Sequence, residues 1–138
     1  MTPILAAYDG SRQSVRAFEM ALEFARWKSL DLVVLAVIQI PELHEPEERQ
    51  RIVSIRRKEL EQGQRELKNR FEPAPVSIEW EIHEGHPVDT ILERIERLKS
   101  PHIFLGHRGR KGIFQQLLMG SVSKRIADFA PCTVTIVR

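Results

Sequence analysis

The stretch DLVVLAVIQI, from Asp31 to Ile40, decides the fold. Its apolar residues follow one another without polar alternation, and many of them are β-branched. A run of this kind is typical of a parallel strand that is buried on both faces of a sheet. Pro41 follows directly and ends the strand, because proline has no N–H to donate to a neighbouring strand. The stretch therefore predicts an inner strand of a parallel sheet.

Toward the N-terminus, residues 4–8 (ILAAY) form a second buried run, and the turn sequence Asp9-Gly10-Ser11 closes it. Between the two strands, residues 14–29 have apolar positions at helical spacing, which predicts an amphipathic helix capped by Ser11 or Ser14. Its expected inward residues are Val15, Phe18, Leu22 and Ala25.

Residues 47–71 consist mainly of Glu, Arg, Lys and Gln, and Pro73 and Pro75 follow them. This pattern predicts a long exposed helix that lies on the sheet by one narrow face. The apolar stripe would consist of Ile52, Ile55 or Arg56, Leu60 and Leu67. A nucleic-acid-binding or coiled-coil helix is the weaker alternative, because opposite charges at helical spacing usually only solvate a face.

The remaining chain continues the alternation of strands and helices. Residues 76–85 predict a strand near a sheet edge, residues 86–100 a helix, and residues 102–106 a short strand. Residues 121–130 predict a last helix and residues 132–137 a last strand. The expected inward residues of these two helices are Val88, Ile91, Leu92, Ile95 and Leu98, then Val122, Ile126 and Phe129. The order predicts one α/β domain over residues 1–138, an open parallel five-stranded sheet with helices on both faces.

The composition excludes several classes of protein. A net charge of +2 with 29% charged residues does not favour a dedicated nucleic-acid binder. The one cysteine, Cys132, excludes an internal disulfide and suits a reducing compartment; we expect it to be a small buried hydrophobe. No apolar run approaches the ~20 residues of a membrane span, and no basic segment precedes the first apolar residues. We therefore expect a cytoplasmic protein with no membrane partner.

Ligands of an open α/β sheet bind at the carboxyl ends of the strands, where the strand order reverses. The stretch GHRGRKGIFQQLLMGSVS, from Gly106 to Ser123, follows one such end. Gly106 and Gly109 leave backbone N–H groups open to a close approach, and Gly120-Ser121 would expose the first N–H groups of a helix. These groups could hold a polyphosphate, or they could form an ordinary turn and a plain helix cap. Neither a Walker A loop nor a GxGxxG sequence is present.

The strand end YDGS, the turn EGHP and the loop GHRG…GSVS together resemble the universal stress protein family, and the likeness covers essentially the whole chain. In that family, the pattern Gly, two residues, Gly, nine residues, Gly-Ser or Gly-Thr marks ATP binding. Here the interval from Arg110 to Met119 has ten residues, one more than the family pattern. The resemblance implies a flavodoxin-like sheet, of the type found in adenine nucleotide alpha-hydrolases, and a homodimer paired through the C-terminal strand.

The resemblance also implies a binding site. Ala7, Asp9 and Val37 would line the adenosine end, and Leu105, Gly106, Arg108 and Gly109 would flank the ribose and phosphates. Gly120, Ser121 and Val122 would donate to the phosphate chain, with Ser123 as a further candidate. The implied cofactor is ATP, with AMP or ADP as alternatives and with Mg²⁺ as a possible companion.

Other chemistry has weaker support. His83 and His86, with His44 or His107, are too scattered for a typical metal site, so we expect none. No GxSxG elbow is present, and Ser121 has no identifiable base.

The favoured function is a dimeric, ATP-binding stress-response protein without robust catalysis, slow hydrolysis being left open. The longer loop interval favours the alternative, a dimeric adaptor of the same family that binds no nucleotide. An enzyme of adenylate chemistry is a third candidate, but YDGSRQS lacks the additional phosphate-binding signature that it would need.

Overall fold

The computed structural model describes residues 2–42, 44–107 and 122–138. In this part of the chain, parallel strands form one five-stranded sheet in the order β3-β2-β1-β4-β5. The strands are β1 (Ile4–Ala7), β2 (Leu32–Ile38), β3 (Ile78–Glu84), β4 (His102–Gly106) and β5 (Thr133–Val137). The helices are α1 (Arg12–Lys28), α2 (Pro46–Phe71) and α3 (Pro87–Leu98), and residues 122–129 are also helical. The predicted parallel α/β fold is confirmed.

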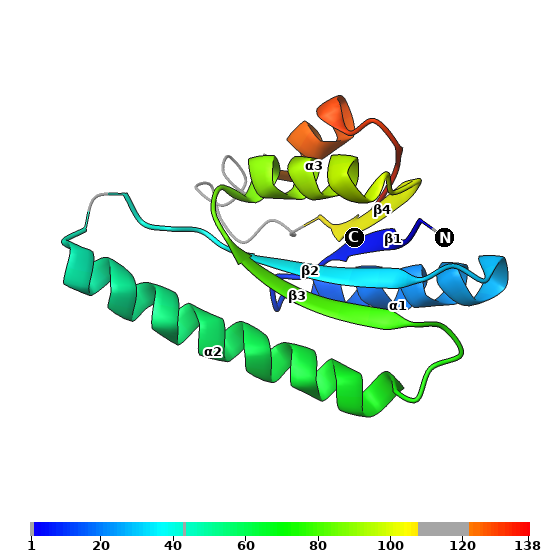
Figure 1. The fold of residues 1–138 in the computed structure, drawn as a ribbon, viewed down its shortest axis with the longest axis horizontal. Helices are drawn as coiled ribbons and strands as arrows, with labels where there is room; N and C mark the ends of the chain where they lie inside the picture. Colours follow the sequence, from blue (N-terminus) through cyan, green and yellow to red (C-terminus); the bar gives the residue numbers. More distant parts are fainter. Residues whose placement is uncertain (1, 43, 108–121) are drawn as a thin grey trace.

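Helices cover both faces of the sheet. Figure 1 shows α1 and α2 on one face and α3 with helical residues 122–129 on the other. Alternate residues of β2 serve the two faces: Val34 packs toward α1 and α2, whereas Val33 and Leu35 pack toward α3. Because both faces are buried, β2 needs no polar alternation, which explains the run that predicted it.

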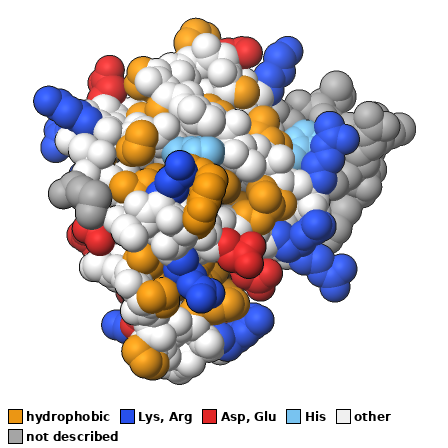
Figure 2. Space-filling model, turned by 90° about the vertical axis from the view of Figure 1, so that its right-hand side faces the viewer, with side chains coloured by type: hydrophobic (Ala, Val, Ile, Leu, Met, Phe, Trp, Pro, Cys, Tyr) orange, Lys and Arg blue, Asp and Glu red, His pale blue; other side chains and the backbone are white. Residues whose placement is uncertain are grey.

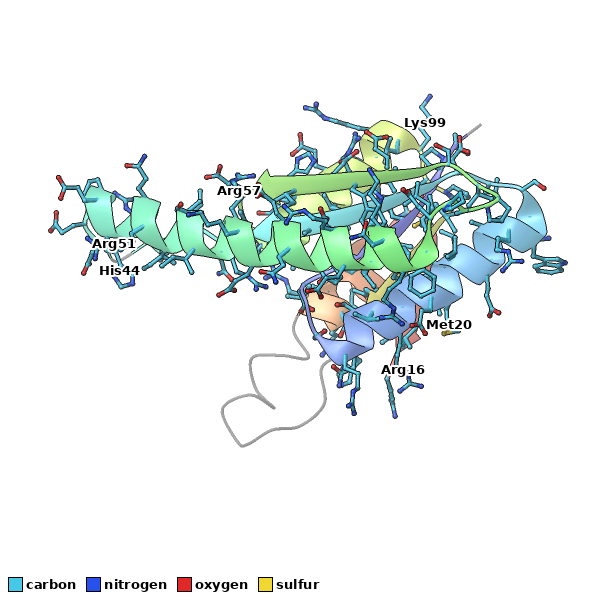
Figure 3. The ribbon with its side chains drawn as sticks, turned by 90° about the horizontal axis from the view of Figure 1, so that it is seen from below. Arg16, Met20, His44, Arg51, Arg57 and Lys99 are labelled. Carbon is cyan, nitrogen blue, oxygen red and sulfur yellow. The ribbon has the colours of Figure 1, made fainter. Side chains whose placement is uncertain are left out.

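The long helix α2 lies along β3 and extends past its end. Its buried residues are Leu60, Gln64 and Leu67, all in the second half of the helix. Figures 1 and 3 show the first half, near the labelled Arg51, projecting beyond the end of the sheet. The predicted narrow contact face is confirmed for Leu60 and Leu67, but Ile52 and Ile55 are 39% and 54% exposed.

The predicted edge position of β3 is confirmed. Side chains of neighbouring helices form hydrogen bonds with polar groups of this strand. Gln64 of α2 donates from Nε2 to the Glu81 carbonyl oxygen over 3.0 Å. Arg94 of α3 binds the Glu81 carboxylate through two N–H groups at 2.8 and 2.6 Å. Side chains of two helices thus meet one residue of this edge strand from its two faces.

One expected core residue is on the surface. Phe129 is 64% exposed, although the sequence pattern placed it inward. The buried face of helical residues 122–129 includes Ser123 and Ile126, with Val122 partly buried. Successive residues of an α-helix are rotated by about 100°, so Phe129 lies just outside the face centred between Ser123 and Ile126.

Cys132 is partly buried against the α3-side cluster, and burial raises the pKa of its thiol. This environment agrees with its expected role as a small apolar residue.

Figure 2 views the end of the molecule at which the strands begin, and hydrophobic, basic and acidic side chains are intermixed over it. Among the described helices, none combines the length and the apolar character that crossing a bilayer requires.

Candidate functional site

A pocket of about 500 Å³ lies where β1, β2 and β4 end. The sheet order places β1 in the centre, with β2 on one side and β4 on the other, so the strand order reverses at this position. Seven of the predicted site residues line the pocket: Ala7, Asp9, Val37, Leu105, Gly106, Val122 and Ser123. The fold therefore brings together residues that are up to 116 positions apart, at the edge where open α/β sheets bind ligands.

The other predicted residues, Arg108, Gly109, Gly120 and Ser121, lie outside the described part of the chain. The expected phosphate contacts of those four residues therefore remain predictions from the sequence.

A network of local hydrogen bonds fixes the turn after β1. The Asp9 carboxylate accepts from the Ser11 N–H at 2.9 Å, and Ser11 caps α1 by accepting from the Ser14 N–H at 3.1 Å. The Ser14 hydroxyl accepts from the Asp9 N–H at 3.3 Å and donates to the Ser11 carbonyl at 2.8 Å. Ser11 is thus the cap of α1, and the Asp-Gly-Ser sequence holds Asp9 against the pocket.

The part of the pocket that β1, β2 and α3 line has an apolar wall. Ala7 of β1 pairs in register with Leu35 of β2, and Val37 continues the same wall two residues further. Ile91 of α3 also lines the pocket. Aliphatic walls combined with a few polar groups, which here include the buried Ser14 and Ser123, are the usual form of a small-molecule site.

The absence of a side chain at Gly106 serves the packing of α1. A Cβ atom at this position would lie 2.6 Å from the Gln13 carbonyl carbon and 2.8 Å from the Ser14 nitrogen. The end of β4 can therefore approach the first turn of α1 only because residue 106 is glycine. From the sequence alone, a ligand is the expected partner of this close approach.

On the β4 side, Ser123 is buried and its hydroxyl lies 3.2 Å from Nδ1 of His107. Ser123 and Val122 reach the pocket from the start of the described helical residues 122–129. A histidine that follows β4 thus contacts a predicted phosphate-site residue, an interaction that the sequence pattern did not indicate.

The projecting half of α2 adds a wall that sequence reasoning missed. Ile52 and Arg56, one helical turn apart, line the pocket. Arg56 donates from Nη2 to the Asp9 carbonyl oxygen at 2.7 Å and from Nη1 to the Glu59 carboxylate at 3.2 Å. The sequence left Ile55 and Arg56 as alternatives for the inward position; the structure places Arg56 there.

Tyr8 also lines the pocket and packs against α2. Burial raises the pKa of its hydroxyl, and the Glu66 and Asp9 carboxylates add to this effect, whereas Arg56 opposes it. Tyr8 is therefore protonated at neutral pH and able to donate a hydrogen bond.

The described lining residues contain few ligands for a metal ion. Among the described residues that line the pocket, Asp9 has the one carboxylate, and no group of three or more His, Cys, Asp or Glu side chains gathers in the described chain. A magnesium ion prefers several oxygen ligands, so any Mg²⁺ here would depend mainly on the oxygens of its own ligand and on water.

The sequence model of the universal stress protein family matches residues 1–138. The chain belongs to this family. A universal stress protein of Methanocaldococcus jannaschii is 28% identical over 138 residues, which cover 98% of this chain and 81% of the relative. Universal stress protein YxiE of Bacillus subtilis is 30% identical over 147 residues, with 98% and 97% covered.

Solved structures of universal stress proteins have the same fold. UspA of Lactobacillus plantarum superimposes with a TM-score of 0.82 at 25% identity, covering 99% of this chain and 97% of that one. A universal stress protein in complex with cAMP gives 0.76 at 24% identity, with 99% and 97% covered. A family member from Arabidopsis thaliana with AMP bound gives 0.70 at 21% identity, with 99% and 91% covered.

Proposed function

We propose that this universal stress protein binds an adenine nucleotide in the pocket at the ends of β1, β2 and β4. The observation that carries the proposal is the convergence of Ala7, Asp9, Val37, Leu105, Gly106, Val122 and Ser123 on one pocket of about 500 Å³. These residues are far apart in the sequence, so local sequence patterns do not explain why they line one pocket. Their meeting at the reversal of strand order supports a ligand that spans β2 to β4.

The nucleoside half of the ligand would lie on the β2 side. There the apolar wall of Ala7, Leu35 and Val37 suits the faces of a purine ring, and the Asp9 carboxylate is an acceptor for its amino group. The phosphates would extend toward Gly106, Val122 and Ser123, with Arg108, Gly109, Gly120 and Ser121 as the predicted remaining contacts.

The bound nucleotides of relatives support an adenine ligand. AMP and cAMP are bound by the Arabidopsis thaliana protein and by a second family member, respectively. All three candidate ligands of this chain, ATP, ADP and AMP, share the adenosine half with these molecules. We propose ATP as the physiological ligand, because the predicted glycine-rich loop contains enough N–H donors for a phosphate chain.

We propose a regulatory role without robust turnover, in the cytoplasm. The described lining residues supply one carboxylate, Asp9, which accepts from the Ser11 N–H and is held by that bond. Hydrolysis of a phosphoanhydride generally requires both a positioned base and ligands for the metal ion that binds the phosphates. One carboxylate does not supply both.

We further propose a homodimer through β5. Within the described sheet β5 pairs with β4 alone, so its outer edge presents backbone N–H and C=O groups to a second copy. The side chains of Ile136 and Phe129, 39% and 64% exposed, add apolar surface in the C-terminal part of the chain.

Thermal unfolding in the presence of ATP and Mg²⁺ tests the proposal. A ligand present at 100 times its dissociation constant stabilises the folded state by about 2.7 kcal/mol. We expect this stabilisation in the wild type and its loss in Asp9→Ala and in Gly120→Val. Asp89→Ala, whose side chain is 80% exposed on α3, is the matched control. If wild type shows no shift with ATP, ADP or AMP, the adaptor function replaces this proposal; phosphate release in the same sample would indicate an enzyme.

A further inference from the structure

The role of Arg56 in the pocket is defined by two contacts that hold its guanidinium in place. One terminal nitrogen donates to the Asp9 carbonyl, 47 positions away in the sequence, and the other to Glu59 on the next turn of α2. A guanidinium carries five N–H donors in a rigid plane, so these two bonds leave it capacity for more. Its side chain is 34% exposed and lines the pocket.

The side from which Arg56 enters indicates which part of a ligand it meets. α2 packs on β2 and β3, and Arg56 contacts Asp9, two residues after the end of β1. Gly106 and Ser123 belong to the opposite side of β1, because the sheet order places β4 there. The guanidinium therefore lies beside Asp9, on the β2 side of the pocket, whereas Gly106 and Ser123 lie on the β4 side.

We propose that Arg56 is a specificity-determining residue that recognises the base of the bound nucleotide by donating to one of its ring nitrogens. This inference rests on the proposed nucleotide site. Ring nitrogens of adenine are hydrogen-bond acceptors, and a donor already fixed by Asp9 and Glu59 binds them without a further ordering cost. Ile52, one turn earlier on the same helix face, contributes an apolar contact beside it.

The first experiment compares adenosine, AMP and ATP as ligands of wild type and Arg56→Gln by calorimetric titration. Loss of one hydrogen bond from a charged donor corresponds to about a tenfold loss of affinity. Because Arg56 meets the base, we expect the same loss for all three ligands. A loss that increases with the number of phosphates would overturn the proposal in favour of a phosphate contact.

Arg57→Gln is the matched control. Arg57 is the neighbouring residue, but it pairs with Glu84 at 2.7 Å and does not line the pocket; Figure 3 labels it beside the end of β3. We expect this variant to bind all three ligands like the wild type. An equal loss in both variants would show a general effect of α2 charge and would overturn a specific role for Arg56.

The second experiment separates contact with the base from a purely structural role. Analogues of adenosine that lack ring nitrogen 1, 3 or 7 are titrated against wild type and Arg56→Gln. We expect one analogue to bind wild type about tenfold more weakly than adenosine, and Arg56→Gln to bind that analogue and adenosine equally. If Arg56→Gln weakens adenosine and every analogue by one common factor, Arg56 only supports the pocket wall and the inference fails.

Failure of the proposed function has a different signature. If wild type binds neither adenosine, AMP nor ATP, the nucleotide site itself is refuted. If wild type binds them and Arg56→Gln binds them equally well, the site stands and only the role of Arg56 is refuted.

Discussion

Gly63 in the middle of α2 leaves the space that the Tyr8 hydroxyl occupies: a Cβ atom at position 63 would clash with the hydroxyl oxygen and lie 3.0 Å from the ring carbon that carries it. Alanine is the better helix former by about 1 kcal/mol. Overpacking of this contact costs about 1–3 kcal/mol. We therefore expect Gly63→Ala to lower the free energy of unfolding by about 1 kcal/mol, measured by urea denaturation.

Tyr8→Phe tests the cause of that loss. Without the hydroxyl, Gly63→Ala should cost less in the Tyr8→Phe background than in the wild type, because the closest contact is gone. An equal cost in the two backgrounds would mean that the steric relationship between these residues is not what requires glycine.

The ion pair of Arg94 and Glu81 gives a second prediction. The Glu81 side chain is only 9% exposed, and its carboxylate accepts two bonds from Arg94 and contacts His83 at 2.8 Å. Arg94→Met leaves this carboxylate with His83 alone, and we expect a loss of about 2 kcal/mol in unfolding free energy. Arg97→Met, which removes an exposed pair with Glu93, should cost less than about 0.5 kcal/mol.

Because the hydrogen bonds from Arg94 hold the pKa of Glu81 below its usual value, this stabilisation has a pH dependence. It is complete above the pKa of the unfolded glutamate and is lost as the pH falls through the lower folded value. The cost of Arg94→Met should therefore shrink in acid. A cost that is constant down to about pH 3 would contradict the assignment.

Burial of His102 predicts a second loss of stability on acidification, at a higher pH than that of Glu81. Its ring stacks on Phe104 with centroids 4.2 Å apart, and Nε2 lies 2.7 Å from the Thr135 hydroxyl. Burial lowers the pKa of this imidazole, so the unfolded chain binds a proton that the folded chain resists. Stability should fall as the pH decreases below about 6.5.

His102→Phe should flatten this decline between about pH 7 and about pH 5, measured by urea denaturation at each pH. His44→Gln, at an exposed position before α2, controls for the loss of one histidine. If the slope of stability against pH is the same in wild type and His102→Phe, another group is responsible.

The proposed dimer makes Ile136 a critical position. We expect Ile136→Lys to place a charge beside the outer edge of β5 and to convert the dimer to monomer in sedimentation velocity. Ile55→Lys, at a 54% exposed position of α2, should leave the dimer intact. A monomeric wild type would refute the dimer, and two dimeric variants would exclude β5 as its interface.

The sequence was most informative where one local pattern determines one element. The uninterrupted apolar run identified β2 as an inner strand, and the alternation of residues 76–85 identified β3 as an edge. Phe129 was assigned incorrectly because a one-dimensional pattern does not define the centre of a helix face to within one residue. Seven site residues were predicted through the family resemblance and meet in one pocket.

Arg56 could not be chosen over Ile55 from the sequence, because hydropathy favours isoleucine at an inward position. Its orientation follows from the Asp9 carbonyl, an acceptor that local periodicity does not reveal. The packing of Gly106 against Gln13 is likewise a contact between distant segments, so the sequence indicated a special glycine without indicating its neighbour.

The pocket takes its walls from positions as far apart as Ala7 and Ser123. During synthesis on a ribosome, β1, α1 and β2 emerge long before the helix that carries Ser123. A nascent chain consequently has only half of a binding site until almost all of it has been translated. If the proposed function holds, nucleotide would therefore stabilise the complete protein and would bind the growing chain only weakly.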